Sequence, residues 1–79
     1  MRTLHEELDE LLSRARYMET KHPNSAITTD YWNRLVSVCD QGRQFSPEPL
    51  KHVVPDESRQ TWAEALLCLE AVHEAISQT

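Results

Sequence analysis

Glycine and cysteine are scarce in this chain, which has one glycine and two cysteines among 79 residues. Loops that cradle phosphate groups need several glycines, so the sequence offers no nucleotide-binding loop. Small secreted domains usually carry several disulfides. Cys39 and Cys68 instead stand among apolar residues of expected helices, where a free cysteine packs as a small hydrophobe. We therefore expect a reducing compartment, the cytoplasm.

Long apolar runs and an excess of positive charge are also missing. No stretch approaches the roughly 18 apolar residues that cross a bilayer, and the sequence MRTLHEELDELL lacks the apolar segment of a signal peptide. With 13 acidic and 8 basic residues, the net charge is −5, which argues against binding to nucleic-acid phosphates. We expect no membrane partner and no direct nucleic-acid partner.

The length of the chain permits one helical domain, residues 1–79, because a second hydrophobic core would have too few residues. A chain of this size buries only roughly 60% of the surface that it exposes when unfolded. Further stabilisation usually comes from disulfides, a metal or a partner chain. Since disulfides are not expected, a homodimer formed through the last helix is predicted.

Residues 3–22 carry the clearest helical pattern. Their apolar positions alternate in spacings of four and three, which aligns them along one seam of a helix. These positions are Leu4, Leu8, Leu11, Ala15 and Met18, and His22 continues the spacing. Thr3 and Glu6 have the spacing of a capping box, and Pro23 disfavours a helical conformation in the residue before it. The segment is expected to pack as one helix of a bundle.

A second helix is expected over residues 29–41, capped by Thr29 in preference to Thr28 or Asp30. The short link before it predicts that it runs antiparallel to the first helix. Gly42 is the natural residue to end it, because glycine readily adopts the left-handed conformation found after many helices.

Proline is concentrated in the long connection from residue 43 to residue 55, which holds three of the four prolines. Ser46, Pro47 and Glu48 have the pattern of a cap and a first helical turn, so one short turn is expected over about residues 47–52. Four apolar side chains are expected to close one end of the core: Phe45, Leu50, Val53 and Val54.

The last helix, expected over residues 57–77, is the most apolar segment. A helical projection predicts that one side faces the core: Trp62, Ala65, Leu66, Leu69, Val72, His73 and Ile76. A second surface is made of Leu67, Glu64, Glu70 and Glu74, with Cys68 and Ala75 at its margins. The chain is therefore expected to be all-α, a small three-helix bundle of antiparallel helices with a proline-rich connection before the last helix.

Two Glu-x-x-His sequences, Glu19 to His22 and Glu70 to His73, are the sharpest candidates for a metal site. Residues three apart face the same way on a helix, as in carboxylate-bridged di-iron bundles. Glu19 and Glu70 lie at the edges of their apolar stripes, however, and such a site needs further buried acids. No cofactor is expected, and a metal-binding bundle is kept as an alternative.

Catalytic residues are not evident. A thiol nucleophile would need Cys39 or Cys68 beside a histidine, and both cysteines have the setting of inert core residues. A DNA-recognition helix would need basic residues, but no lysine or arginine follows Arg59. We therefore expect neither an enzyme nor a helix-turn-helix protein.

Binding to another protein is the function class that remains. The partner-binding residues are expected to be Trp62, Glu64, Leu67, Glu70, Glu74 and Tyr17. We expect a regulator, adaptor or inhibitor of the accessory or phage-encoded kind, with a partner whose surface is basic or apolar. An alternative is an acidic mimic of nucleic acid that blocks a nucleic-acid-binding protein through Glu6, Glu7, Asp9 and Glu10.

Overall fold

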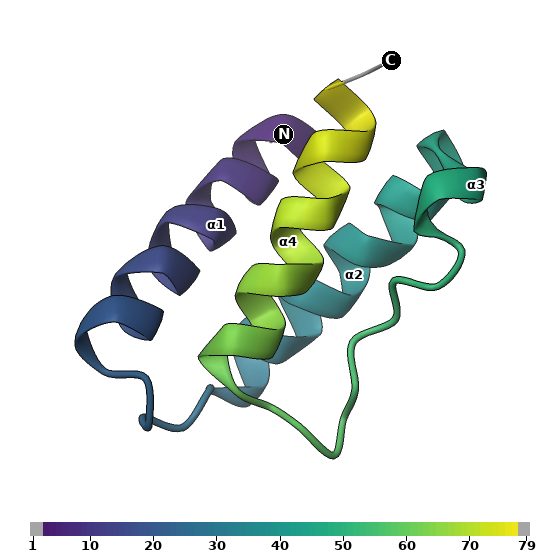
Figure 1. The fold of residues 1–79 in the computed structure, drawn as a ribbon. Coiled ribbons are helices and arrows are strands. Elements are labelled where there is room, and N and C mark those ends of the chain that lie inside the picture. The colour runs from purple at the N-terminus through teal and green to yellow at the C-terminus, as the bar shows by residue number, and fades with distance from the viewer. Residues whose placement is uncertain (1–2, 78–79) are drawn as a thin grey trace.

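The structure, a computed structural model, describes residues 3–77, and within them it contains four helices and no strand. The helices are α1 (Leu4–Lys21), α2 (Thr29–Phe45), α3 (Pro47–Leu50) and α4 (Trp62–Ser77). The three long helices pack against one another, and α3 is a single turn close to the end of α2 (Figure 1). The expected all-α bundle of three principal helices is confirmed.

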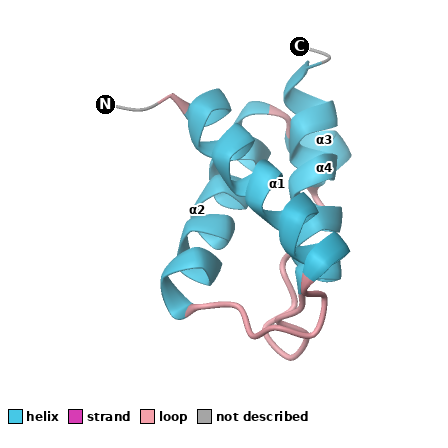
Figure 2. Cartoon of the chain, turned by 90° about the vertical axis from the view of Figure 1, so that its left-hand side faces the viewer, coloured by secondary structure: helices cyan, strands magenta, loops and turns pink. Residues whose placement is uncertain are grey.

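α1 runs antiparallel to both α2 and α4, whereas α2 and α4 run in the same direction (Figure 1). The connection formed by residues 51–61 causes this arrangement, because it returns along the bundle and starts α4 beside the start of α2. The rings of Tyr31 and Trp62 meet there edge to face, with centroids 4.9 Å apart. At the other end, Leu4 and Ile76 line one small depression. Figure 2 shows the loop between α1 and α2 and the end of the 51–61 connection at the same end of the bundle.

Threonine side chains cap the three principal helices. The Oγ1 atoms of Thr3, Thr28 and Thr61 accept hydrogen bonds from the N–H groups three residues later, at 3.1, 3.2 and 3.2 Å. A cap of this kind contributes roughly 1 kcal/mol to stability. The expected cap at Thr3 is confirmed, whereas the expected cap of α2 is wrong, since Thr29 is already the first helical residue.

α4 begins at Trp62, later than the expected start at residue 57. Asp56 accounts for the difference, because its Oδ1 atom accepts hydrogen bonds from the N–H of Ser58 at 2.9 Å and from its hydroxyl at 2.7 Å. Short polar side chains often compete with helix formation by bonding to nearby backbone groups. Residues 57–61 therefore belong to the connection.

Gly42 lies inside α2, so the prediction that it ends this helix is wrong. It does not adopt a positive φ angle. A Cβ atom at this position would lie 2.8 Å from Val72 Cγ1 and 3.3 Å from Leu50 Cδ1. Glycine is present because α2 and α4 approach too closely for a side chain. The helix continues to Phe45 and ends at Ser46, whose N–H donates to the carbonyl oxygen of Gly42 at 2.9 Å.

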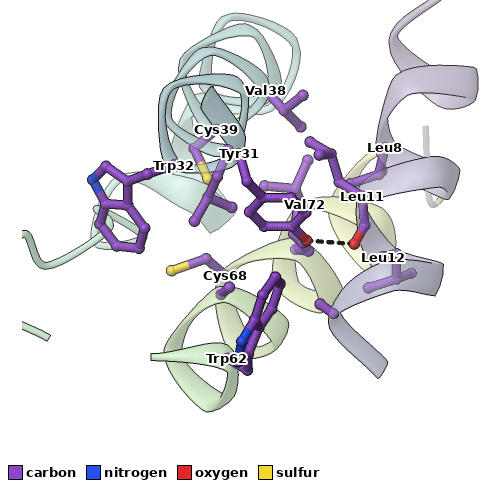
Figure 3. Packing of buried hydrophobic residues seen from close by; sticks show 14 of the residues in the cluster. Leu8, Leu11, Leu12, Tyr31, Trp32, Val38, Cys39, Trp62, Cys68 and Val72 are labelled. Atoms are coloured by element: carbon purple, nitrogen blue, oxygen red, sulfur yellow. Dashed lines mark hydrogen bonds between the residues drawn. The ribbon is translucent and has the colours of Figure 1, made fainter. Parts of the chain in front are cut away.

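The core contains side chains from all four helices and from the link before α2. Its buried apolar members are Leu8, Leu11, Leu12, Ala15, Ile27, Tyr31, Trp32, Leu35, Val38, Cys39, Leu50, Trp62, Ala65, Cys68, Leu69, Val72, Ala75 and Ile76. In Figure 3, Tyr31 reaches across to α1, where its hydroxyl donates to the carbonyl oxygen of Leu11 at 2.5 Å. This long-range bond satisfies the polar end of an otherwise enclosed ring.

The buried face of α4 differs from the predicted one. Cys68 and Ala75, expected at the margins of the second surface, are buried, while Leu66 and His73, expected in the core, are half-buried. The reason is that α4 packs against α1 and α2 at once, so its buried arc includes positions on both sides of the line through Leu69.

Other expected core positions are exposed. His22 lies beyond the end of α1 and is exposed, although it continues the spacing of the seam. Of the four apolar residues expected to close one end of the core, Leu50 is buried and Val53 half-buried, but Phe45 and Val54 are exposed. Phe45 faces outward because α2 extends past Gly42 and carries this side chain to the surface.

Substitution of Gly42 by alanine is expected to destabilise the fold. Overpacking against Val72 should cost about 1–3 kcal/mol, more than the roughly 1 kcal/mol that alanine gains over glycine in helix propensity. Urea denaturation measures the free energy of unfolding. In a Val72→Ala background the cost should shrink or change sign, and a cost equal in both backgrounds would contradict the close contact.

Substitution of Tyr31 by phenylalanine is expected to change how stability depends on pH. Burial raises the pKa of Tyr31 above its ordinary value of 10.0. A raised pKa adds stability that is fully present below the unfolded value and is lost as the pH rises further. The free energy of unfolding of the wild type should therefore fall from about pH 10 upward.

The Tyr31→Phe variant should lack that part of the decline and should lose about 1 kcal/mol at neutral pH with the hydrogen bond to Leu11. Urea denaturation at several pH values measures both effects. The exposed Tyr17 supplies a matched control, because Tyr17→Phe should behave like the wild type. Equal pH profiles for the wild type and Tyr31→Phe would show that burial of Tyr31 does not affect its titration.

Candidate functional site

An apolar depression of about 230 Å³ lies between α4 and the 51–61 connection, and we call it the α4 groove. Its lining residues are His52, Val53, Val54, Glu64, Leu67, Cys68 and Ala71. Leu67 and Val54 are 66% and 61% exposed, so two large apolar side chains face solvent at the same depression. Single exposed apolar residues are common, whereas adjoining ones often mark a binding surface.

The helix side of the groove follows from how α4 packs. Ala65, Leu69 and Val72 face the core and are fully buried. Leu67 and Ala71 are four residues apart, so they share another face of the helix and lie one turn from each other. Residues of the connection line the groove beside this face, and Ala71 also borders Pro49 of α3.

The connection side of the groove is held by Arg43 at the end of α2. Its Nη1 atom donates to the carbonyl oxygen of Val53 at 2.6 Å, and the same guanidinium contacts the carboxylate of Asp40. The N–H of Val53 in turn donates to the carbonyl oxygen of Leu50 at 3.0 Å. These contacts place Val53 and Val54 opposite Leu67, so Arg43 positions one wall of the groove.

Two of the expected acidic residues lie beside this apolar surface. Glu64 lines the groove, and its Oε1 atom lies 4.0 Å from the Sγ atom of Cys68. Glu74 lines a neighbouring depression of about 180 Å³ together with Pro49, Ala71 and Ala75. Because Ala71 lines both depressions, the surface is continuous along α4 and is acidic at both ends.

Glu70 does not belong to this surface. Its Oε1 atom lies 3.9 Å from Nε of Arg16, and both side chains are exposed, so Glu70 sits at the boundary between α4 and α1. An exposed ion pair of this kind contributes little to stability. The structure therefore separates Glu70 from Glu64, Leu67 and Glu74, with which the sequence had grouped it.

Trp62 is not available to a partner, because it is 3% exposed and its ring packs against Tyr31. Its place at the start of α4 turns the indole toward the core and not toward the groove (Figure 3). Tyr17 is exposed on α1, with its ring centroid 6.1 Å from that of His22, and it does not line the groove. Of the six expected partner-binding residues, the structure brings Glu64, Leu67 and Glu74 together.

Cys68 and Cys39 form a contact that the sequence did not predict. Cys68 lines the groove, Cys39 lies behind it on α2, and both are free thiols. The hydrogen bond between the two side chains, together with burial, raises the pKa of Cys39. Only the packing of α2 beside α4 brings these residues together, since nothing in their local sequences relates them.

No group of three or more histidine, cysteine or acidic side chains within residues 3–77 is arranged to hold a metal ion. Glu19 and His22 lie at the end of α1, where the N–H of His22 donates to the carbonyl oxygen of Met18 at 2.7 Å. Glu70 and His73 lie on α4. The four candidate ligands do not form a shared site, which a bundle of the di-iron kind would need.

Part of the acidic first turn of α1 is paired within the chain. Nε of Arg34 lies 2.6 Å from Oε1 of Glu7, and Nη2 of Arg34 lies 3.2 Å from Oε1 of Glu10. These hydrogen bonds raise the pKa of Arg34, the bond to Glu7 having the largest effect. Of the acids considered for a nucleic-acid mimic, Glu7 and Glu10 are therefore directed at α2.

Comparison of the chain with protein-family models, with curated proteins and with solved structures found no match. Within the part of the chain that the structure describes, no helix combines the length and hydrophobicity needed to cross a bilayer. A function can therefore be inferred only from the arrangement of this protein's own side chains.

Truncation of Leu67 is expected to leave stability almost unchanged. Leu67→Ala should alter the free energy of unfolding by no more than about 0.5 kcal/mol, because the side chain is exposed. Leu69→Ala, on the buried side of the same helix, should cost about 2–5 kcal/mol. Urea denaturation compares the two. A large loss for Leu67→Ala would mean that Leu67 supports the fold and is not a free surface residue.

Proposed function

We propose that this protein is a small acidic interaction module that binds a partner protein through the α4 groove. It acts as a regulator, adaptor or inhibitor, and not as an enzyme. The observation that supports this proposal is the exposure of Leu67 and Val54 on opposite walls of one apolar depression, with Glu64 beside them. An apolar centre with a polar rim is the common anatomy of protein interfaces.

The chemistry of the groove favours a partner segment that is both apolar and basic. One apolar side chain fits between Leu67 and Val54, while lysine or arginine side chains can pair with Glu64 and Glu74. These two acids are ten positions apart on one helix, roughly 15 Å along its axis. An amphipathic helix of about three turns spans that distance and is a recurring ligand for such grooves.

The acidic charge increases the rate of association with a basic partner and the selectivity against acidic proteins. The net charge of −5 attracts a basic partner over a distance before contact and repels acidic proteins. The mimicry of nucleic acid is less well supported, because Arg34 already pairs with Glu7 and Glu10. We place the protein in a reducing compartment such as the cytoplasm, which suits its two free thiols.

The homodimer expected from the size of the chain stays a prediction. Pairing of two copies through their grooves would bring Glu64 and Glu74 of one copy toward the same acids of the other. Like charges at an interface are costly, so a heterologous basic partner fits this surface better. Sedimentation at high micromolar protein concentration decides between a monomer and a dimer.

Capture from a lysate of the source cells tests the proposal when wild type and variants are compared side by side. Immobilised wild-type protein should retain a partner that the Leu67→Asp variant loses at least roughly tenfold, since a central interface residue contributes about 1.4 kcal/mol or more. Mass spectrometry identifies and quantifies the retained proteins. Raised salt should weaken retention, because acidic groups contribute to binding.

The matched control is Tyr17→Asp, which places the same charge at an exposed residue away from the groove. It should retain the partner as the wild type does. Retention of the same proteins by all three forms, or equal loss with both variants, would contradict the α4 groove as the binding site. Loss only on neutralisation of Glu6 and Asp9 would favour the acidic mimic instead.

A further inference from the structure

Cys39 and Cys68 lie on the facing sides of α2 and α4, with both sulfur atoms between the two helices (Figure 3). Cys39 is completely buried. Cys68 is 4% exposed and is one of the residues that line the α4 groove. One thiol of the pair is therefore reached from the groove, and the other lies behind it.

The close approach of α2 and α4 extends to this pair. Cys39 precedes Gly42 by about one helical turn, and Cys68 precedes Val72 by about one turn. Since the two helices run in the same direction, the cysteines form the layer next to the contact of Gly42 with Val72. In that contact a Cβ atom on Gly42 would lie 2.8 Å from Val72 Cγ1. The proximity of the two thiols raises the pKa of Cys39 and lowers that of Cys68.

We propose that Cys39 and Cys68 form a redox-active dithiol that a small hydroperoxide, entering through the α4 groove, oxidises to an intramolecular disulfide. Hydrogen peroxide is small enough for this route, because the groove has a volume of about 230 Å³ and a water molecule occupies roughly 30 Å³ in the liquid. The site does not depend on partner binding, since it requires only the groove and the packing of α2 on α4.

Cys68 is the sulfur that attacks first. The Cys68 thiol first releases its proton. The thiolate then attacks one oxygen of hydrogen peroxide, the O–O bond breaks, and the departing hydroxide takes up the released proton to form water. Cys68 is then a sulfenic acid. The sulfur of Cys39 attacks the Cys68 sulfur, the S–O bond breaks, and the departing hydroxide takes the Cys39 proton. Two thiols and one peroxide give one disulfide and two waters, and the sulfurs supply two electrons.

The surroundings of the pair fit these roles. The hydrogen bond from Cys39 stabilises a thiolate at Cys68 and lowers the pKa of Cys68, against the opposing effects of burial and of Glu64. The thiolate is the reactive form of cysteine. Cys39 is enclosed in the core beside Cys68. It can therefore react with an oxidised Cys68 before a thiol of another chain does.

Treatment of the folded full-length protein with hydrogen peroxide tests this proposal. Intact mass should fall by two hydrogen atoms, and a non-reducing protease digest should contain a peptide that links residues 39 and 68. Sedimentation should show no new covalent dimer. Retention of both thiols under conditions that oxidise glutathione, or cross-linking only after denaturation, would overturn the proposal. This measurement needs no variant and decides the matter even if cysteine substitutions impair folding.

Two variants assign the order of attack. Cys39→Ser should accumulate a sulfenic acid on Cys68, which a 1,3-diketone reagent traps and mass spectrometry locates. Cys68→Ser should leave Cys39 unmodified over the same time. Equal reaction of Cys39 in the Cys68→Ser variant would overturn the role of Cys68. The capture experiment with Leu67→Asp tests partner binding, and this mass measurement tests disulfide formation. A negative result in one does not contradict the other proposal.

Discussion

Close packing of α2 against α4 underlies both the groove and the pair of thiols. Because Gly42 has no side chain, Val72 can pack directly against the backbone of α2. The two helices are parallel neighbours, which forces the chain between them to return the length of the bundle. Residues 52–54 of that returning segment lie beside α4 and form the second wall of the groove. The same contact joins the two cysteines, so the groove and the thiol pair share one structural cause.

Local sequence signals predicted the elements of the fold, and tertiary contacts decided where several of them end. The cap at Thr3 and the helix-ending effect of Pro23 depend on neighbouring residues alone, and α1 was predicted nearly to its bounds. Gly42 and Asp56 each allow two local structures. A glycine can end a helix or admit a neighbouring helix, and an acid can cap a helix or hold a turn. The outcome depends on what packs nearby, which a single sequence does not contain.

The candidate site was predictable only where it lies on a helix. Leu67 was identified because the helical period places it away from the core face. Val54 was assigned to the core for its apolar character alone, since the connection has no period from which the direction of a side chain can be read. Trp62 was predicted to face the core and was also proposed to bind a partner for its residue type, and the structure buries it against Tyr31. Where a surface is shared by a helix and an irregular segment, the sequence therefore predicts only the residues that the helix contributes.

The hydrogen bond from Arg43 to Val53 has a consequence for how tightly the groove can hold a ligand. One wall of the groove belongs to a well-packed helix, but the other is an irregular segment that Arg43 holds through the carbonyl oxygen of Val53. Segments of this kind open locally at lower free energy than the core. When the segment opens, the groove is lost, so the apparent affinity of the proposed site equals its intrinsic affinity multiplied by the fraction of molecules in which the wall is in place. For the proposed partner, Arg43 would thus affect affinity by holding the wall in place, without touching the ligand itself.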